Sequence, residues 1–161
     1  MHAGVITISD KGFHGTREDK SGPEIIAMLK DAGIDVTSIK IIPDEKNEIK
    51  KTLIDFADKK NIPLIITTGG TGVSPRDMTP DATLEVIDKE VPGMAEAMRQ
   101  ASAAITPYAM ISRAVVGIRG RSLIVNLPGS PKAVHENLAV ILPALKHAIE
   151  KIKGDDAECA S

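Results

Sequence analysis

The chain has 161 residues, of which 42% are hydrophobic and 26% are charged, a balance typical of one globular domain with a single core. Aromatic residues make up only 2% and the formal net charge is −2, so the sequence has neither stacking platforms nor a basic field for nucleic acid. No stretch is long and apolar enough to span a bilayer, and the N-terminus lacks the pattern of a signal peptide. The only cysteine, Cys159, has no partner for an internal disulfide, which suits a reducing cytoplasm. We therefore expect a cytoplasmic protein that binds neither membranes nor nucleic acid.

Strand and helix patterns alternate along the first part of the chain. Short apolar runs rich in β-branched residues predict strands at 3–9, 34–42 and 64–68. The last of these is apolar on both faces, as expected in the middle of a covered parallel sheet. The two intervening segments have helical periodicity, with Ser21 as the expected cap of the first and Gly33 at its end. The second of these helices is expected over 45–59.

The rest of the chain continues this alternation. Thr79 is the expected cap of a helix that begins at Pro80 and ends at Val86, and another helix is expected to begin at Gly93. Two strand patterns surround residues 119–121 and predict a short β-hairpin. The last helix is expected over 130–152, with a kink at an internal proline, and residues 154–161 are expected to form a flexible tail. We thus predict a single domain at 1–153, with an α/β layer structure and a mostly parallel sheet.

Two glycine loops follow predicted strands of this sheet. GGTGVSPRDMTP begins at Gly69, and PGSP begins at Pro128. Each loop leads into a helix that has a Ser or Thr near its start and a proline in its first turn, and free amides at helix starts favour anions. Ligands bind at the carboxyl ends of strands in such sheets, so two loops predict a ligand with more than one phosphate, or two phosphorylated ligands. Taken alone, a glycine turn is equally well interpreted as a tight connection between strand and helix, and no Gly-Lys-Ser/Thr follows it as in a P-loop.

Two aspartates add a chemical signal to these loops. Asp44 ends the second strand and Asp77 lies just past the glycines, so neighbouring parallel strands would place both on one rim. Two carboxylates beside phosphates repel unless a cation lies between them, and Mg²⁺ is the cation held by carboxylates and substrate phosphates together. Asp44 has an alternative interpretation as a helix N-cap. Arg76 could clamp a phosphate or pair with Asp77.

Other polar side chains carry weaker signals. None of the four histidines has a second ligand at metal spacing, which argues against a zinc site. Ser130 lacks the G-x-S-x-G turn of a nucleophile, so we expect it to cap the last helix.

Six separated segments, in order along the chain, resemble one known family. They are ITISD at 6–10, IPDE at 42–45, TTGGTGVSPRDMTPDAT at 67–83, VPGMAEAMR at 91–99, SRAVVGIRG at 112–120 and LPGSPKAV at 127–134. Together they are similar to the molybdenum-cofactor biosynthesis family, and the resemblance extends from about Val5 to the final helix. It implies a three-layer α/β/α fold, usually assembled as a homotrimer.

The resemblance also implies an activity. Members of the family act as Mg²⁺-dependent nucleotidyltransferases, which join AMP from ATP to the terminal phosphate of molybdopterin and release pyrophosphate. Their product passes to a metal-inserting enzyme, so a transient contact with such a partner is expected. Close paralogues of the same fold have little of this activity, and the alternative is therefore a trimer that binds molybdopterin without modifying it.

Site residues carry over by motif. Asp44 and Asp77 match the essential carboxylates of the family and are expected to hold Mg²⁺. The residues expected to contact the nucleotide or molybdopterin are Ser9, Asp10, Gly69, Gly70, Thr71, Gly72, Arg76, Gly93, Met94, Ser112, Arg113, Pro128, Gly129 and Ser130.

Overall fold

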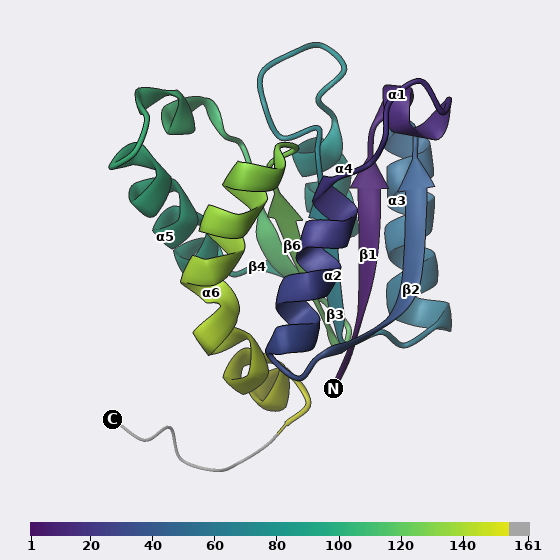
Figure 1. Ribbon diagram of the computed structural model, residues 1–161. Helices are drawn as coiled ribbons and strands as arrows, with labels where there is room; N and C mark the ends of the chain where they lie inside the picture. The colour runs from purple at the N-terminus through teal and green to yellow at the C-terminus, as the bar shows by residue number, and fades with distance from the viewer. Residues whose placement is uncertain (155–161) are drawn as a thin grey trace.

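A six-stranded sheet forms the middle of the molecule, in the order β2-β1-β3-β6-β5-β4 (Figure 1). The computed structural model describes residues 1–154, so the tail expected at 154–161 lies outside the described residues apart from Gly154. The strands are β1 (His2–Ile8), β2 (Asp35–Ile42), β3 (Leu64–Thr68), β4 (Lys89–Glu90), β5 (Val116–Arg119) and β6 (Ser122–Leu127).

The sheet is mostly parallel, as the sequence predicts. β1 pairs in parallel with both β2 and β3, and β3 pairs in parallel with β6. β5 is antiparallel to β6 and to β4, and the predicted hairpin turns at Gly120, which has a φ of 54°. All five residues of β3 are buried, which confirms its expected place in the interior of the sheet.

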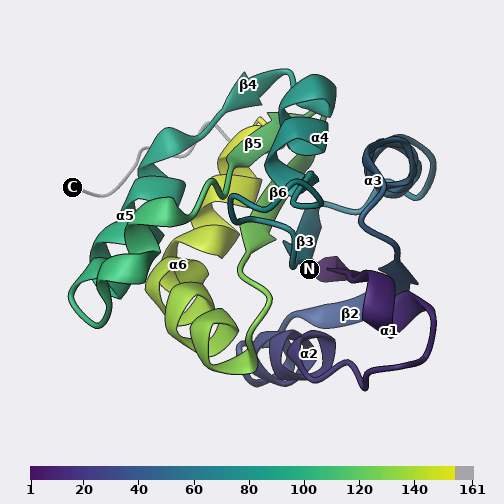
Figure 2. The same ribbon diagram turned by 90° about the horizontal axis from the view of Figure 1, so that it is seen from above.

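Helices cover both faces of the sheet, and Figure 2 shows the resulting three layers from above. One face is covered by α2 (Ser21–Asp31), α5 (Pro92–Ala103) and α6 (Pro131–Ile152), and the other by α3 (Lys46–Ile54) and α4 (Thr79–Val86). Three shorter elements complete the fold: α1 (Asp10–Phe13), the wider helical turn η1 (Asp55–Lys59) that continues α3, and the 3₁₀-helix η2 (Pro107–Ile111). Within residues 1–154, no helix combines the length and the apolar character needed to cross a membrane.

Each strand sends alternate side chains into two separate cores. In β3, Leu64 and Ile66 pack with α2, α5 and α6, whereas Ile65 packs with α3 and α4. In β6, Val125 and Ile124 divide in the same way. This alternation follows from the period of two in a strand, and it explains why the parallel strands are apolar throughout.

Two predicted helix caps are wrong. Ser21 lies inside the first turn of α2, and the capping side chain is Asp19, whose Oδ1 accepts hydrogen bonds from the amides of Ser21 (3.1 Å) and Gly22 (3.0 Å). A carboxylate can accept from both amides at once, and the Thr7 hydroxyl holds its other oxygen at 2.7 Å. Thr79 is likewise the first residue of α4, and its hydroxyl donates to the Gly69 carbonyl instead of capping the helix.

The remaining differences concern short elements and helix ends. α5 begins one residue before Gly93, at a proline, and α3 ends at Ile54 before the wider turn η1. Ser130 caps α6 as expected, since its hydroxyl accepts a hydrogen bond from the Ala133 amide at 3.2 Å. The elements α1, β4 and η2 are absent from the sequence-based assignment, because two to five residues are too few to establish a hydrophobic period.

Candidate functional site

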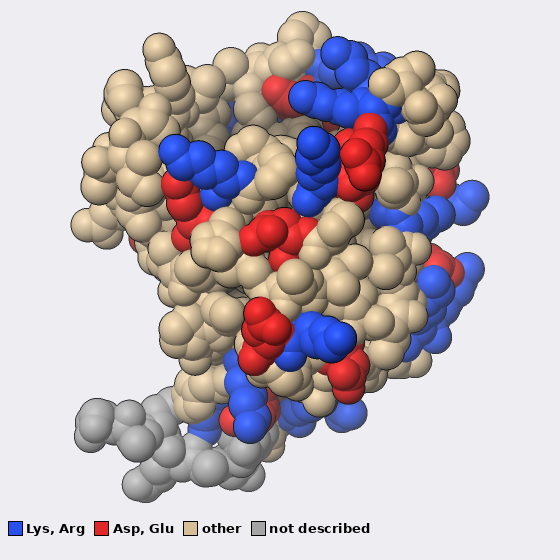
Figure 3. All heavy atoms as spheres, viewed as in Figure 1, with Lys and Arg blue, Asp and Glu red and all other residues tan. Residues whose placement is uncertain are grey.

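The carboxyl edge of the parallel strands carries a cavity of about 740 Å³. Its walls come from the loops after β1, β2, β3 and β6 and from the start of α2, which all lie at the upper end of the molecule in Figure 1. Charged side chains of both signs gather over the same upper part of the surface in Figure 3. The lining residues are Thr7, Ile8, Ser9, Gly12, Arg17, Glu18, Asp19, Lys20, Ser21, Asp44, Thr68, Gly69, Gly70, Asp77, Gly129, Ser130 and Pro131.

Glycine is required where β3 enters this cavity. Gly69 and Gly70 have φ values of 99° and 65°, in the left-handed region that other residues rarely adopt. A side chain at Gly69 would also collide with the carbonyl oxygen of Ile8, and one at Gly129 would meet the Gly69 Cα at 3.4 Å. The two glycine loops predicted from the sequence therefore lie side by side.

The first glycine loop presents unused amide groups. Gly69 donates its N–H to Leu127, while its own carbonyl and that of Gly70 accept from the hydroxyl and the amide of Thr79. Among residues 1–154, no acceptor is found for the amides of Gly70 and Thr71. Such amides, held in place by a buried threonine, can receive the oxygens of an anion.

Asp44 lies in the cavity wall and is not a helix cap. α3 has Glu45 at its N-cap position and no capping side chain. Asp44 Oδ2 instead accepts from the Asp10 amide at 2.8 Å, and the Asp44 amide donates back to Asp10 Oδ1 at 3.0 Å. Burial raises the pKa of the Asp44 carboxyl above its usual range, and the negative charges of Asp10 and Asp77 act in the same direction. This wall therefore has an excess of negative charge that a cation would relieve.

Asp77 lies beside the first glycine loop. Its Oδ2 accepts from the Ser74 amide at 2.9 Å, and its own amide donates to the Ser74 carbonyl at 2.9 Å, which closes a turn. A side chain at Gly72 would come within 2.8 Å of Asp77 Oδ2. Asp44 and Asp77, far apart in the chain, thus line one cavity.

Arg76 does not pair with Asp77, the second of its two predicted roles. Its guanidinium makes two-pronged hydrogen bonds to Asp10, at 2.9–3.0 Å, and a third to Glu45 at 3.0 Å. These hydrogen bonds hold the pKa of the Asp10 carboxyl below its usual range. Neither Asp10 nor Arg76 lines the cavity, and each is the other's ion-pair partner.

A second cavity of about 250 Å³ adjoins the first across the glycine loops. Four predicted site residues line it: Thr71, Gly72, Ser112 and Pro128. Its other walls come from α5, η2 and the first turns of α6, including the exposed ring of Tyr108.

Besides Asp10 and Arg76, three further predicted site residues line neither cavity: Gly93, Met94 and Arg113. Gly93 and Met94 lie in the first turn of α5, where Met94 packs against the core. Arg113 supports the glycine loop, since it donates to the carbonyls of Gly72 (2.8 Å) and Asp77 (2.5 Å) and pairs with Asp81 at 3.1 Å.

Comparison with known proteins identifies the family to which this chain belongs. The family model described as "Probable molybdopterin binding domain" matches residues 4–147, which is most of the chain. The chain belongs to this family of molybdopterin-binding domains.

Relatives of this chain include proteins of similar length and much longer ones. Molybdopterin adenylyltransferase of Helicobacter pylori (strain J99) is 40% identical over 157 residues, covering 96% of this chain and 89% of that protein. Gephyrin of Dictyostelium discoideum is 44% identical over 91% of this chain, which spans only 22% of gephyrin. The solved structure of the molybdopterin biosynthesis enzyme MoaB from Thermus thermophilus superposes with a TM-score of 0.90 at 48% identity, covering 95% of this chain and 96% of that one. This likeness confirms the three-layer α/β/α fold.

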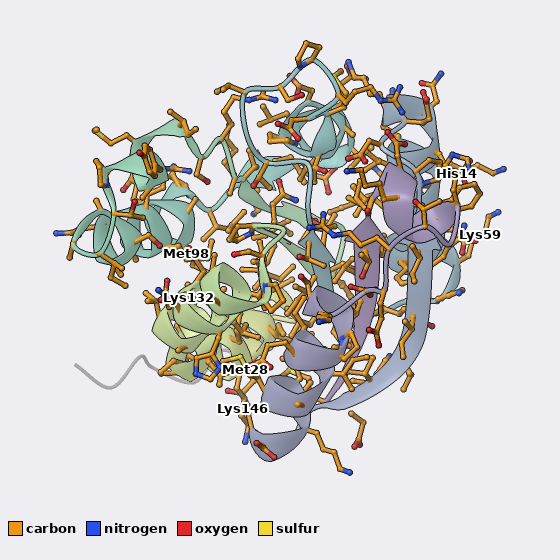
Figure 4. The ribbon with its side chains drawn as sticks, turned by 45° about the horizontal axis from the view of Figure 1, so that its top comes forward. His14, Met28, Lys59, Met98, Lys132 and Lys146 are labelled. Atoms are coloured by element: carbon orange, nitrogen blue, oxygen red, sulfur yellow. The ribbon has the colours of Figure 1, made fainter. Side chains whose placement is uncertain are left out.

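Some residues lining the site of this molybdopterin-binding domain were missed in the sequence analysis. Arg17, Glu18, Asp19 and Lys20 come from the segment that joins α1 to α2, and Ser21 is the first residue of α2. The available signal was their position in the chain: they lie in the connection between β1 and α2, and α/β sheets bind ligands at the carboxyl ends of their strands. His14, at the start of the same segment, is exposed and lies on the outer side of α1 in Figure 4.

The two aspartates fit a magnesium ion that is shared with a substrate. Asp44 Oδ1 and Asp77 Oδ1 accept no hydrogen bond from residues 1–154, so each carboxylate has one oxygen available. In that same part of the chain, no group of three or more His, Cys, Asp or Glu side chains could enclose a metal ion. Mg²⁺ is commonly bound by one or two carboxylates together with waters and substrate phosphates, which is what two free oxygens beside unused amides allow.

Proposed function

We propose that this chain is a molybdopterin adenylyltransferase, which transfers AMP from ATP to the terminal phosphate of molybdopterin and releases pyrophosphate. The observation that carries the proposal is the meeting of Asp44, Asp77 and both glycine loops on one cavity, with a second cavity adjoining it. Two adjoining cavities suit a reaction between two substrates. The relatives of matching length that bear the name of this activity support the same assignment.

The chemistry requires alignment more than a strong base. A phosphate oxygen of molybdopterin attacks the α-phosphorus of ATP, a new P–O bond forms, and the bond between the α-phosphorus and the bridging oxygen breaks, so that pyrophosphate leaves. The attacking oxygen is already anionic at neutral pH, so no side chain needs to remove its proton. The amides of Gly70 and Thr71, which have no acceptor among residues 1–154, would bind phosphate oxygens and hold the reacting groups in line.

Asp44 and Asp77 are the residues that would hold Mg²⁺ in this reaction. The ion, when bound, supplies positive charge that neutralises the nucleotide phosphates and the departing pyrophosphate. The turn closed by Asp77 and Ser74 and the amide of Asp10 fix the two carboxylates before a ligand arrives.

Incubation of the purified protein with ATP, Mg²⁺ and molybdopterin tests the proposal. We expect pyrophosphate and adenylylated molybdopterin in equal amounts, both dependent on added Mg²⁺. Binding of molybdopterin without pyrophosphate release would contradict the proposal and favour the alternative, a binding protein of the same fold. ATP hydrolysis that is independent of molybdopterin would also contradict it.

We also propose that the chain works as a homotrimer in the cytoplasm and passes its product to a metal-inserting enzyme through a transient contact. The trimer is supported by an exposed apolar patch at the end of α5 and in η2, formed by Ile105, Tyr108, Met110 and Ile111. More than half of each of these side chains is exposed, which is unusual for a set of neighbouring large apolar residues on a monomer.

A further inference from the structure

The arginines that motif matching placed at the site are not available to a substrate. Arg76 is held by Asp10 and Glu45, and Arg113 by Asp81 together with two carbonyls of the glycine loop. Both ligands of the proposed reaction are anions, and four carboxylates already line the cavity: Glu18, Asp19, Asp44 and Asp77. Other positive groups are therefore needed to bind them.

Arg17 and Lys20 are the two cationic side chains that line the cavity. Within residues 1–154, neither side chain forms a hydrogen bond or an ion pair. Both residues are exposed, and both belong to the segment between α1 and α2, which Figure 2 shows at the edge of the molecule beside these two helices. They are cations that the fold brings to the cavity without giving them a protein partner.

The backbone around Lys20 is fixed on both sides. Asp19 is held by the Thr7 hydroxyl at 2.7 Å and caps α2, and the Ser21 hydroxyl donates to the Gly129 carbonyl at 2.6 Å. Ser21 thereby ties the start of α2 to the second glycine loop. Lys20 lies between two anchored residues, so binding of a ligand by Lys20 orders less backbone than binding by a residue of a mobile loop would.

The capping of α2 by Asp19 also explains why a cationic side chain such as Lys20 is needed at this wall of the cavity. The amides of Ser21 and Gly22 are already satisfied by Asp19, so the N-terminus of α2 cannot itself receive an anion. Positive charge at this wall of the cavity must therefore come from side chains.

We propose that Arg17 and Lys20 form a phosphate-binding subsite of the cavity. The inference deepens the proposed function, on which its choice of ligands rests. The ligand group is a phosphate of one substrate, supplied either by the phosphate chain of ATP or by the terminal phosphate of molybdopterin. Lys20 binds it as a point charge, and Arg17 can bind two oxygens with its planar guanidinium.

Glu18 allows a second, opposite test of this subsite. It lines the same cavity and lies between the two cations in sequence, and its carboxylate has no partner among residues 1–154. Its negative charge opposes binding of a phosphate. Replacement of Glu18 by glutamine should therefore tighten binding of the ligand that replacement of Lys20 weakens.

Direct binding and steady-state kinetics test the subsite. The variants are Arg17→Ala, Lys20→Ala, Lys20→Arg and Glu18→Gln, with Lys146→Ala as the control, an exposed lysine on α6 far from the cavity (Figure 4). We expect Lys20→Ala to raise the Kd and KM of one phosphate-bearing substrate by roughly ten-fold, as the loss of a charge-assisted hydrogen bond does, with little change in kcat. Lys20→Arg should restore most of the affinity, and Glu18→Gln should lower the Kd.

The two substrates are measured separately by calorimetry and by kinetics. A change confined to ATP assigns the subsite to the nucleotide, and a change confined to molybdopterin assigns it to the acceptor; either result supports the subsite. Unchanged Kd values for both ligands in Lys20→Ala, Arg17→Ala and the double variant would overturn it. Because Kd is measured without turnover, a wild-type protein that binds ATP but releases no pyrophosphate would refute the proposed function while the subsite is still decided by the variants.

Discussion

At the scale of single residues, Asp77 combines a structural and an electrostatic property that one substitution can separate. Its Oδ2 closes a turn with the Ser74 amide, and its charge faces the cavity that it shares with Asp44. The side-chain carbonyl of an asparagine can accept the same hydrogen bond but carries no charge. The turn should therefore survive the change to asparagine, while the affinity for a cation should not.

Asp77→Asn is expected to keep the fold and to lose adenylyl transfer by about a hundred-fold or more, the usual cost of removing one preorganised electrostatic group. Thermal unfolding followed by circular dichroism should give a Tm close to that of the wild type, and pyrophosphate release should show the loss. Asp31→Asn, at the end of α2 and away from the cavity, is the control. Full turnover by Asp77→Asn would remove Asp77 from the proposed site.

Gly69 is held by two constraints that another glycine of the chain allows us to distinguish. Both Gly69 and Gly33 have positive φ, at 99° and 73°, but a Cβ at Gly33 would meet nothing within 4 Å, whereas one at Gly69 would strike the Ile8 carbonyl. Gly33→Ala should cost about 1 kcal/mol of unfolding free energy, the cost of the left-handed backbone. Gly69→Ala should cost clearly more, and urea denaturation can compare the two. Equal losses would mean that the loop moves freely away from β1.

At the scale of elements, an ion-pair cluster joins α3 to α4 on the far side of the sheet from α6. Glu85 of α4 pairs with Lys46 of α3 and, at 2.6 Å, with Lys50. Hydrogen bonds from Lys46 and Lys50 lower the pKa of Glu85 from 4.5 to about 2. The unfolded chain therefore binds a proton on this group at a higher pH than the folded chain does.

This shift has a defined sign in the pH dependence of stability. A carboxyl whose pKa is lowered by folding contributes stability that is fully present above pH 4.5 and is lost as the pH falls towards about 2. Glu85→Gln should accordingly lower the Tm slightly between about pH 5 and 7, by little because the pair is exposed to solvent. The Tm curves of the variant and the wild type should converge as the pH falls below about 3. A constant difference at all pH values would show that the ion pairs contribute nothing.

The elements that could be predicted from the sequence are those long enough to show a hydrophobic periodicity. β1 and β3 have apolar side chains on both faces because two cores pack against them, and the hairpin turn at Gly120 needs a positive φ. The two-residue strand β4 is too short to show any periodicity, and it forms through antiparallel pairing with β5. The cap of α2 was misassigned to Ser21, since the capping side chain is Asp19, two residues earlier, which is positioned by the Thr7 hydroxyl of β1.

At the scale of the whole molecule, the site follows from topology more than from motif. The parallel order of β2, β1 and β3 brings the carboxyl ends of strands that are distant in the chain to one edge, so the shared cavity of Asp44 and Asp77 could be predicted. The partners of Arg76 could not, because Asp10 and Glu45 compete with Asp77 for the same guanidinium and only the folded geometry decides between them. Arg17 and Lys20 could not be predicted as site residues for a different reason, since no local sequence pattern distinguishes them from ordinary surface residues.

The apolar patch at η2 makes the assembly of the whole protein testable without a ligand. Met110 is 76% exposed and lines neither cavity, so a charge there should disturb subunit contacts and leave substrate binding groups in place. Sedimentation should give three times the 17.1 kDa chain mass for the wild type and a lower mass for Met110→Lys, because a buried unpaired charge is costly at an interface. Leu84→Lys, an exposed apolar position on α4 away from the patch, should keep the mass of the wild type. A trimer that survives Met110→Lys would place the subunit contact on another face, and a monomeric wild type would contradict the trimer itself.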